Sequence, residues 1–215
     1  MSDSDGPLVT AVHEPPLAGQ AGTSARGGES RAAILDAAKT LFSANGSRGT
    51  SLASIASAAG LSQPGLLHHF PSKSALLLAV LADRDRADGE LSSAHLTGDG
   101  LDILTALASL VEHNQGQPEI VRLFSVLLGE SLSRSHPAHG QFRTRYRRIR
   151  SRNLRKLRQA EARGQIREGV DLDALSPVIV AVMDGLQYQW LLDDSVDMLR
   201  SFRVFCDLLV RGLSN

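Results

Sequence analysis

Cysteine and aromatic residues are scarce in this 215-residue sequence. The single cysteine, Cys206, excludes an internal disulfide framework and a zinc site built from several thiolates. Aromatic residues make up 4% of the chain, whereas Ala, Leu, Ser and Arg are abundant, a balance that favours helices over sheets. No apolar run approaches the roughly 20 residues of a membrane span, and the acidic N-terminus does not resemble a signal peptide. We therefore expect a helical, cytoplasmic protein that contacts no membrane.

Net charge is absent too, because 23 basic residues balance 23 acidic ones. Attraction to phosphate depends on local patches, however, and the charge is unevenly spread. Arg and Lys number one against four acidic residues in 1–30, four against one in 31–75, and twelve against two in 133–168. Zero net charge therefore does not exclude a nucleic-acid partner.

The chain divides into an arm and a helical remainder. Residues 1–28 are rich in Gly, Pro, Ser and Ala without apolar periodicity, which predicts a disordered arm. From Glu29 onward apolar residues recur at helical spacing, and no alternating strand pattern of useful length occurs. We expect an all-α protein with about nine helices.

The first part of the helical remainder carries closely spaced start and stop signals. A helix that begins near residue 30 should end at Gly46, a residue suited to the left-handed position after a helix. Thr50 is placed to cap a second helix and Gly60 to break it, and Ser62 can cap a third. Two short helices joined by a glycine turn, with longer helices on both sides, predict a helix-turn-helix.

This segment resembles the TetR family of bacterial transcriptional regulators. The match includes the glycine turn, the His-Phe ending of the third helix and the Ser-Lys that follows. The matching residues are Arg31, Ile34-Leu35, Ala37-Ala38, Leu41-Phe42, Gly46, Thr50-Ser51-Leu52, Ile55-Ala56, Ala59-Gly60-Leu61-Ser62, Leu66, His68-His69-Phe70, Ser72-Lys73 and Leu76. The remainder matches loosely, apart from Asp184-Gly185-Leu186 and Trp190-Leu191, which resemble a recurring C-terminal helix of the family.

The resemblance implies a disordered arm over 1–28, a three-helix DNA-binding domain over 29–76, and a larger helical effector-binding and dimerisation domain over 77–215. It implies that Thr50 and Ser51 hold phosphate through hydroxyl and backbone N–H groups, and that Gln63 reads a base, because Gln pairs bidentately with adenine. At Leu67 the family usually places a tyrosine that contacts phosphate. The DNA-binding residues expected on this basis are Arg48, Thr50, Ser51, Gln63, Gly65, Leu67, His68 and Lys73.

Apolar stripes after residue 90 predict two further sites. A cavity between the central helices would bind an effector through apolar walls and a few polar groups. Its candidate residues, which core packing explains equally well, are His113, Phe124, Met183, Gln187 and Tyr188. The last two helices are too apolar for one buried face each, which predicts a two-fold four-helix interface between identical subunits. The interface candidates are Val178, Ala181, Gly185, Phe202, Phe205 and Leu209.

The arginine-rich segment over 143–167 leaves three interpretations open. Its basic side chains form a solvated face, they bind an acidic partner, or one of them lies in the cavity and binds an anionic ligand. Apolar residues at helical spacing, including Phe142, Ile149 and Leu157, favour the solvated face because they turn most arginines outward.

Together these patterns predict a homodimeric transcriptional repressor. It would bind double-stranded DNA at a palindromic operator and be released from it by a small-molecule effector. An activator with the same motif is one alternative, and a protein that binds nucleic acid or a partner through its arginine-rich helix is another. The sequence has no nucleophile elbow, phosphate loop, HExxH motif or paired carboxylates, so we expect no enzyme, catalytic residue, metal or cofactor.

Overall fold

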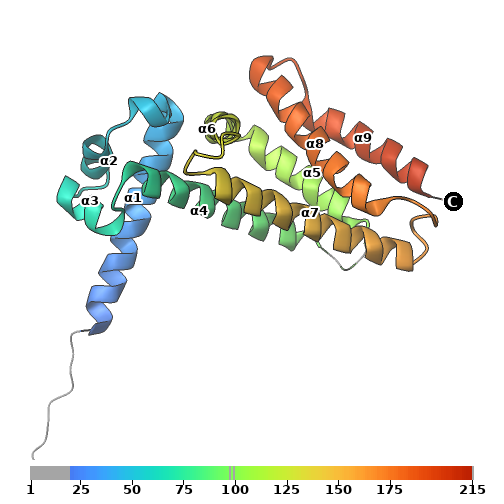
Figure 1. Cartoon of the computed structure of the whole chain (residues 1–215), viewed down its shortest axis with the longest axis horizontal. Coiled ribbons are helices and arrows are strands. Elements are labelled where there is room, and N and C mark those ends of the chain that lie inside the picture. The colour runs from blue at the N-terminus through green and yellow to red at the C-terminus, as the bar shows by residue number, and fades with distance from the viewer. Residues whose placement is uncertain (1–19, 97, 99, 215) are drawn as a thin grey trace, which may run out of the picture.

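The computed structural model describes residues 20–96, 98 and 100–214, and the side chains among them from residue 27 onward. These residues form nine α-helices and no strand, as the sequence predicts (Figure 1). A small head contains α1 (Gln20–Gly49), α2 (Leu52–Ala58) and α3 (Gln63–His69). The larger body contains α5 (Asp102–Gln115), α6 (Pro118–Glu130), α7 (His139–Ala162), α8 (Leu172–Leu192) and α9 (Met198–Leu213). Helix α4 (Lys73–Ala94) runs from the head into the body.

Helix α1 is longer than the sequence predicted. It begins at Gln20, so residues 20–28 are helical where a disordered arm was expected, whereas residues 1–19 of that arm lie outside the described residues. Extending a helix costs much less free energy than nucleating one, so a segment of weak propensity can continue it. The predicted break at Gly46 is confirmed: its φ of 71° and ψ of 167° are accessible to glycine without steric cost.

Side-chain caps hold the two short helices of the head. Ser51, and not Thr50 as predicted, caps α2: its hydroxyl accepts from the Ser54 N–H at 3.0 Å, while the Ser54 hydroxyl accepts from the Ser51 N–H at 3.2 Å. Ser62 caps α3 as predicted. Gly60, at φ 70°, makes the turn between the two helices. Each cap contributes about 1 kcal/mol to the stability of its helix. Helices α2 and α3 are therefore stabilised by contacts within the protein, without bound DNA.

One hydrophobic core joins the head to the body. Phe42 of α1, Ile55 of α2 and Leu66 of α3 are fully buried in it, and the same cluster continues through α4 and α6 to Phe142 of α7. A second core fills the far end of the body between α5, α7, α8 and α9. The domain boundary expected after Leu76 therefore lies inside α4 and inside a continuous core. None of the described helices combines the length and the apolar character that crossing a bilayer requires.

Gly100 allows the segment before α5 to approach the backbone of α7. A Cβ atom there would lie 2.3 Å from the nitrogen of Ala160 and 2.5 Å from its Cα. A helix backbone cannot yield as a flexible side chain does, so Gly100→Ala should destabilise the fold by about 1–3 kcal/mol in urea unfolding. Gly140→Ala in α7, where a methyl group meets open space, is the control and should cost nothing. Equal unfolding midpoints for the two variants would contradict this close approach.

Candidate DNA-binding surface and effector cavity

Helix α3 has an inner face fixed to the head core and an outer face exposed to solvent. Leu66 is fully buried, whereas Gln63 and His68 are exposed and Leu67 is 37% exposed. Gly65 lies among them, and a Cβ there would meet the capping hydroxyl of the helix at 3.3 Å. The four residues of α3 expected to meet DNA are therefore together on one short helix whose outer surface is open to a partner. A major groove admits a helix of this kind.

The two side chains that precede α2 form hydrogen bonds within the protein. Thr50 is 3% exposed, and its hydroxyl donates to the carbonyls of Leu41 and Gly46, at 3.0 and 2.9 Å. A hydroxyl whose proton is held in this way has no proton left to donate to a phosphate unless these bonds are broken, and the phosphate contact of Thr50 stays a prediction. Ser51 is exposed, but its hydroxyl and N–H are used in the capping of α2 with Ser54.

Two ion pairs connect the head to the body. Lys39 Nζ of α1 lies 2.6 Å from Asp83 Oδ2 of α4, and this contact lowers the pKa of the Asp83 carboxyl. Arg48 Nη2, expected to meet DNA, lies 3.1 Å from Glu130 Oε1 of α6, yet its side chain is 90% exposed. Exposed pairs contribute at most about 1 kcal/mol, so Arg48 can exchange this carboxylate for a phosphate. Lys73, at the first residue of α4, is half-buried.

A small cavity of about 50 Å³ lies between α4, α5, α6, α7 and α8. Apolar side chains from α5 to α9 form most of its wall, and several polar groups interrupt that wall. The polar lining residues are Arg84, Asn114, Arg145, Tyr146, Arg152, Asp184 and Gln187. A mostly apolar cavity with a few polar groups is the arrangement that small-molecule sites in proteins share.

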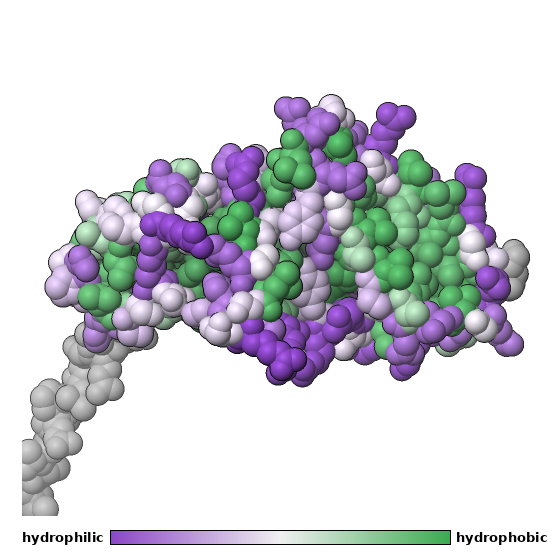
Figure 2. Space-filling view, turned by 45° about the horizontal axis from the view of Figure 1, so that its top comes forward, coloured by the Kyte–Doolittle hydropathy of each residue, from purple (hydrophilic) through white to green (hydrophobic). Residues whose placement is uncertain are grey.

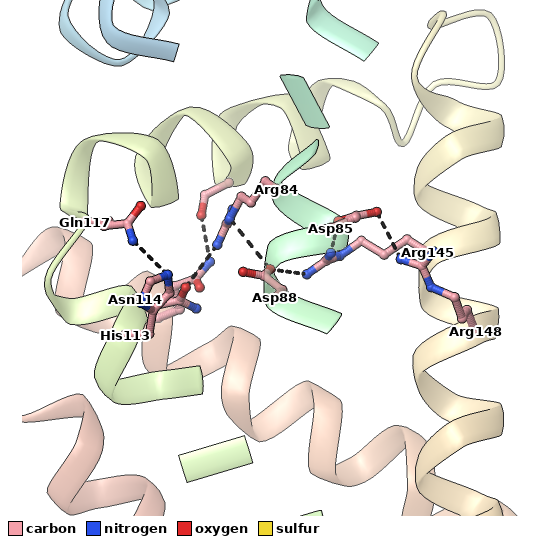
Figure 3. A network of polar contacts seen from close by, with 10 residues as sticks. Arg84, Asp85, Asp88, His113, Asn114, Gln117, Arg145 and Arg148 are labelled. Carbon is pink, nitrogen blue, oxygen red and sulfur yellow. Dashed lines mark hydrogen bonds and ion pairs between the residues drawn. The ribbon is translucent and has the colours of Figure 1, made fainter. Parts of the chain in front are cut away.

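Buried ion pairs tie α4 to α7 beside this cavity (Figure 3). Arg145 of α7 donates to Asp85 and, at 3.4 Å, to Asp88 of α4. Arg84 of α4 donates to the Asn114 side chain of α5 at 3.3 Å. The wall of the cavity is thus held by contacts between charged and polar groups, which have defined geometry, and not by apolar packing alone.

Burial dominates the titration of the charged groups around the cavity. Desolvation raises the pKa of Asp88 and of Asp184 above the ordinary aspartate value, and it lowers the pKa of Arg84. It also lowers the pKa of Arg145 to about 9, which still leaves the guanidinium charged at neutral pH. The Tyr146 hydroxyl donates to Asp184 Oδ2 at 2.7 Å, and desolvation followed by this neighbouring carboxylate raises the pKa of the phenol.

Three of the five effector-binding candidates line the cavity. Phe124, Met183 and Gln187 belong to its wall, and the ring of Phe124 lies beneath two guanidinium groups. His113 and Tyr188 are exposed and are not part of that wall. They were expected there because they lie on the same helices as lining residues, but each lies at the edge of the cavity-facing stripe of its helix, where its side chain is exposed.

The sequence reasoning missed most of the polar lining. Arg84 and Asp88 follow Val80 at spacings of four along the buried face of α4, and Arg145 and Arg152 of α7 are seven residues apart. Charged residues at core positions of an apolar stripe are rare unless they are paired or functional, so this spacing was the available signal. Helix α7 therefore carries exposed arginines on one face and the cavity arginines Arg145 and Arg152 on another, and whether the latter bind an anionic ligand stays a prediction.

Helices α8 and α9 expose apolar side chains along one end of the body (Figure 2). Val178 of α8 is 48% exposed and Leu208 of α9 is 64% exposed. The other exposed members on these helices are Ala181, Tyr188, Leu192 and Val204. A Cβ at Gly185 would meet nothing within 4 Å in this chain.

The interface candidates on α9 need one correction. Phe202 is fully buried in the second core, so its side chain cannot contact a partner subunit, and that prediction is wrong. Phe205 and Leu209 are partly buried against the same core. The exposed face of α9 instead carries Val204 and Leu208, which are four residues apart.

Other reactive groups do not form a site. Within residues 20–96, 98 and 100–214, no group of His, Cys, Asp and Glu is arranged to hold a metal ion. Cys206 is half-buried, and desolvation followed by the neighbouring Asp207 carboxylate raises the pKa of its thiol to about 11. The thiol therefore stays protonated, and thus weakly nucleophilic, at neutral pH.

Two structures of known proteins have this fold. One is the crystal structure of a TetR transcription regulator from Haloarcula marismortui, with a TM-score of 0.79 at 15% identity over 87% of this chain and all of that one. The other is SmeT, the repressor of the Stenotrophomonas maltophilia multidrug efflux pump SmeDEF, with a TM-score of 0.69 at 22% identity over 87% of this chain and 93% of that one.

Sequence comparisons reach the same family. The chain is 27% identical over 195 residues to the HTH-type transcriptional regulator TtgR of Pseudomonas putida, covering 83% of this chain and 89% of that protein. Over 49 residues, 23% of each chain, it is 55% identical to RutR of Escherichia coli K12. Residues 34–80 match the bacterial regulatory proteins of the tetR family, and residues 102–213, about half of the chain, match the C-terminal domain of BetI-type transcriptional repressors. The chain therefore belongs to the TetR family of bacterial transcriptional regulators.

Proposed function

We propose that this regulator is a homodimeric repressor that binds a palindromic operator and is released by a small molecule bound in the cavity between α4 and α8. One observation carries the proposal: α4 is packed in the head core through Leu76 and Val80, and about one turn after Val80 it lines the cavity through Arg84. A ligand that displaces this helix must displace the head as well. The operator lies in the bacterial cytoplasm, where the protein would act.

DNA recognition in this proposal rests on α3. Gln63 reads a base edge in the major groove, and the exposed His68 and Leu67 contact the neighbouring bases. Lys73 and Arg48 neutralise phosphates on either side of the groove. Thr50 serves the head as a buried hydrogen-bond donor in this scheme.

A second subunit fits the exposed apolar face of α8 and α9. Val178, Ala181 and Gly185 lie on one side of α8 at spacings of three and four residues, and Val204 and Leu208 continue the face on α9. Two such helices from each subunit would form a four-helix interface about a two-fold axis. The axis is also required by the DNA, because two recognition helices must meet major grooves about 34 Å apart on a palindrome.

Release requires that the effector bind the conformation that cannot hold DNA more tightly than the one that can. Helix α6 provides a second connection, since it packs in the head core, pairs with Arg48 through Glu130, and lines the cavity through Phe124. Movement of either α4 or α6 would change the distance between the two heads of a dimer.

Binding selection from fragmented genomic DNA tests operator recognition. We expect an enriched palindrome, and we expect Gln63→Ala to weaken binding to it by tenfold or more, in line with about 1–3 kcal/mol for a base contact. Gln159→Ala, an exposed position on α7, is the matched control and should bind as the wild type does. Enrichment of no palindrome would contradict the proposal.

The arginine-rich alternative is tested in the same assay. The variant replaces three exposed arginines of α7 by glutamine, namely Arg143, Arg147 and Arg150. Specific operator binding should persist, because the base-reading residue lies on α3. If it is lost in this variant while Gln63→Ala still binds, the arginine helix is the DNA-binding element.

A charge on the exposed face of α9 should separate the subunits. Leu208→Asp would bury a carboxylate in an apolar interface, so we expect a monomer by light scattering and operator affinity reduced at least a hundredfold. Leu132→Asp alters a leucine that is 77% exposed outside α8 and α9, and it should leave the dimer intact. A dimeric Leu208→Asp variant would place the interface elsewhere.

A further inference from the structure

We propose that the effector is an anion, a small amphipathic carboxylate whose charged end is bound by Arg84 and Arg152 in the cavity beside α4. This inference rests on the proposed function, because it names the chemical class of ligand that the same cavity takes. It derives from two features of the cavity wall, namely unpartnered guanidinium donors and an excess of positive charge.

The unpartnered donors belong to two cavity arginines. The side chain of Arg84 is 9% exposed, and while its Nη2 donates to Asn114, its Nη1 is buried without a hydrogen-bond partner. Nε of Arg152 is likewise buried and unpartnered. An unsatisfied buried donor destabilises the protein, and more so when it carries charge, so an acceptor that enters the cavity recovers that free energy. A carboxylate supplies two acceptor oxygens for such groups.

The charge balance points in the same direction. Six arginines line the cavity and the groove at its mouth, against four acidic residues. The arginines are Arg84, Arg86, Arg145, Arg148, Arg152 and Arg155, and the acidic residues are Asp85, Asp88, Glu90 and Asp184. Asp85 already accepts from two of these arginines. Asp184 accepts from the Tyr146 hydroxyl, and desolvation raises the pKa of its carboxyl. The site as a whole therefore keeps a positive excess that an anion would neutralise and a cation would increase.

A route into the cavity is also basic. An open groove of about 480 Å³ runs between α4 and α7 and shares Leu110, Arg145, Ile149 and Arg152 with the cavity wall. Arg148 and Arg155 extend it toward solvent. Beyond the groove, apolar side chains make up about half of the cavity lining, so a ligand with an apolar body and one anionic end matches both parts of the path.

The small volume of the cavity connects effector binding to release of the operator. The cavity of about 50 Å³ has room for a few water molecules but not for an organic acid. A carboxylate that reaches Arg84 must therefore move α4 away from α7. It would also compete for Arg84 with Asp88, whose Oδ2 lies 3.8 Å from Arg84 Nε and also accepts from Arg145 of α7.

The test uses the full-length protein and linear carboxylates of four to twelve carbons, each compared with its uncharged amide and its amine. We expect at least one carboxylate to bind, by isothermal titration calorimetry, at least tenfold more tightly than its amide and to release the selected operator fragment. The amine of the same length should bind no better than the amide. Equal binding of acid and amide, tighter binding of the amine, or no binding by any carboxylate would each overturn the inference while leaving operator recognition intact.

Substitutions of the two cavity arginines test where the carboxylate binds. Arg84→Met keeps the volume of the side chain but removes its charge, and it should abolish the preference for acid over amide, whereas Arg84→Lys should retain part of it. Arg152→Met gives an independent reading if the first variant unfolds, which circular dichroism would reveal. Arg147→Met, on the exposed face of α7, should keep the full preference. An unchanged preference in folded Arg84→Met and Arg152→Met would also overturn the assignment.

Discussion

Arg145 of α7 donates to Asp85 and Asp88 of α4, and the position of the DNA-reading head depends on this buried contact. Three of the charges involved are almost completely removed from water. A buried pair contributes little net stability compared with an apolar replacement, but loss of one partner leaves an uncompensated charge and costs about 3–5 kcal/mol. Such a contact specifies one arrangement of two helices over others, which is what a regulator with two functional states requires.

The shared helix α4 explains why the head and the body cannot be treated as independent domains. Its first turns complete the head core and its middle turns form the cavity wall, so a displacement of α4 at the cavity would be carried to α3 through packed side chains. The weaker pairs at the surface, Lys39 with Asp83 and Arg48 with Glu130, would offer little resistance to that displacement. Coupling in this fold is therefore a consequence of continuity in the core.

Local signals in the sequence predicted the all-α fold, the break at Gly46 and the cap at Ser62, because each depends on neighbours a few residues away. Phe202 was misassigned because the buried face of α9 is decided by helices distant in sequence. Thr50 was misassigned as the cap of α2 because the bend at Gly46 brings its hydroxyl to the carbonyls of Leu41 and Gly46. The polar lining of the cavity was the least predictable part. Arg145 belongs to a segment of many arginines, and only packing against α4 distinguishes it from its exposed neighbours.

Amide hydrogen exchange in Arg145→Met tests most directly whether this contact holds α4 in place. The account predicts faster exchange, relative to the wild type, throughout α4 and in α3 of the head, while α9 in the second core exchanges as before. Exchange that increases only in α7, with α4 and α3 unchanged, would contradict it, because the head would then be held independently of the cavity.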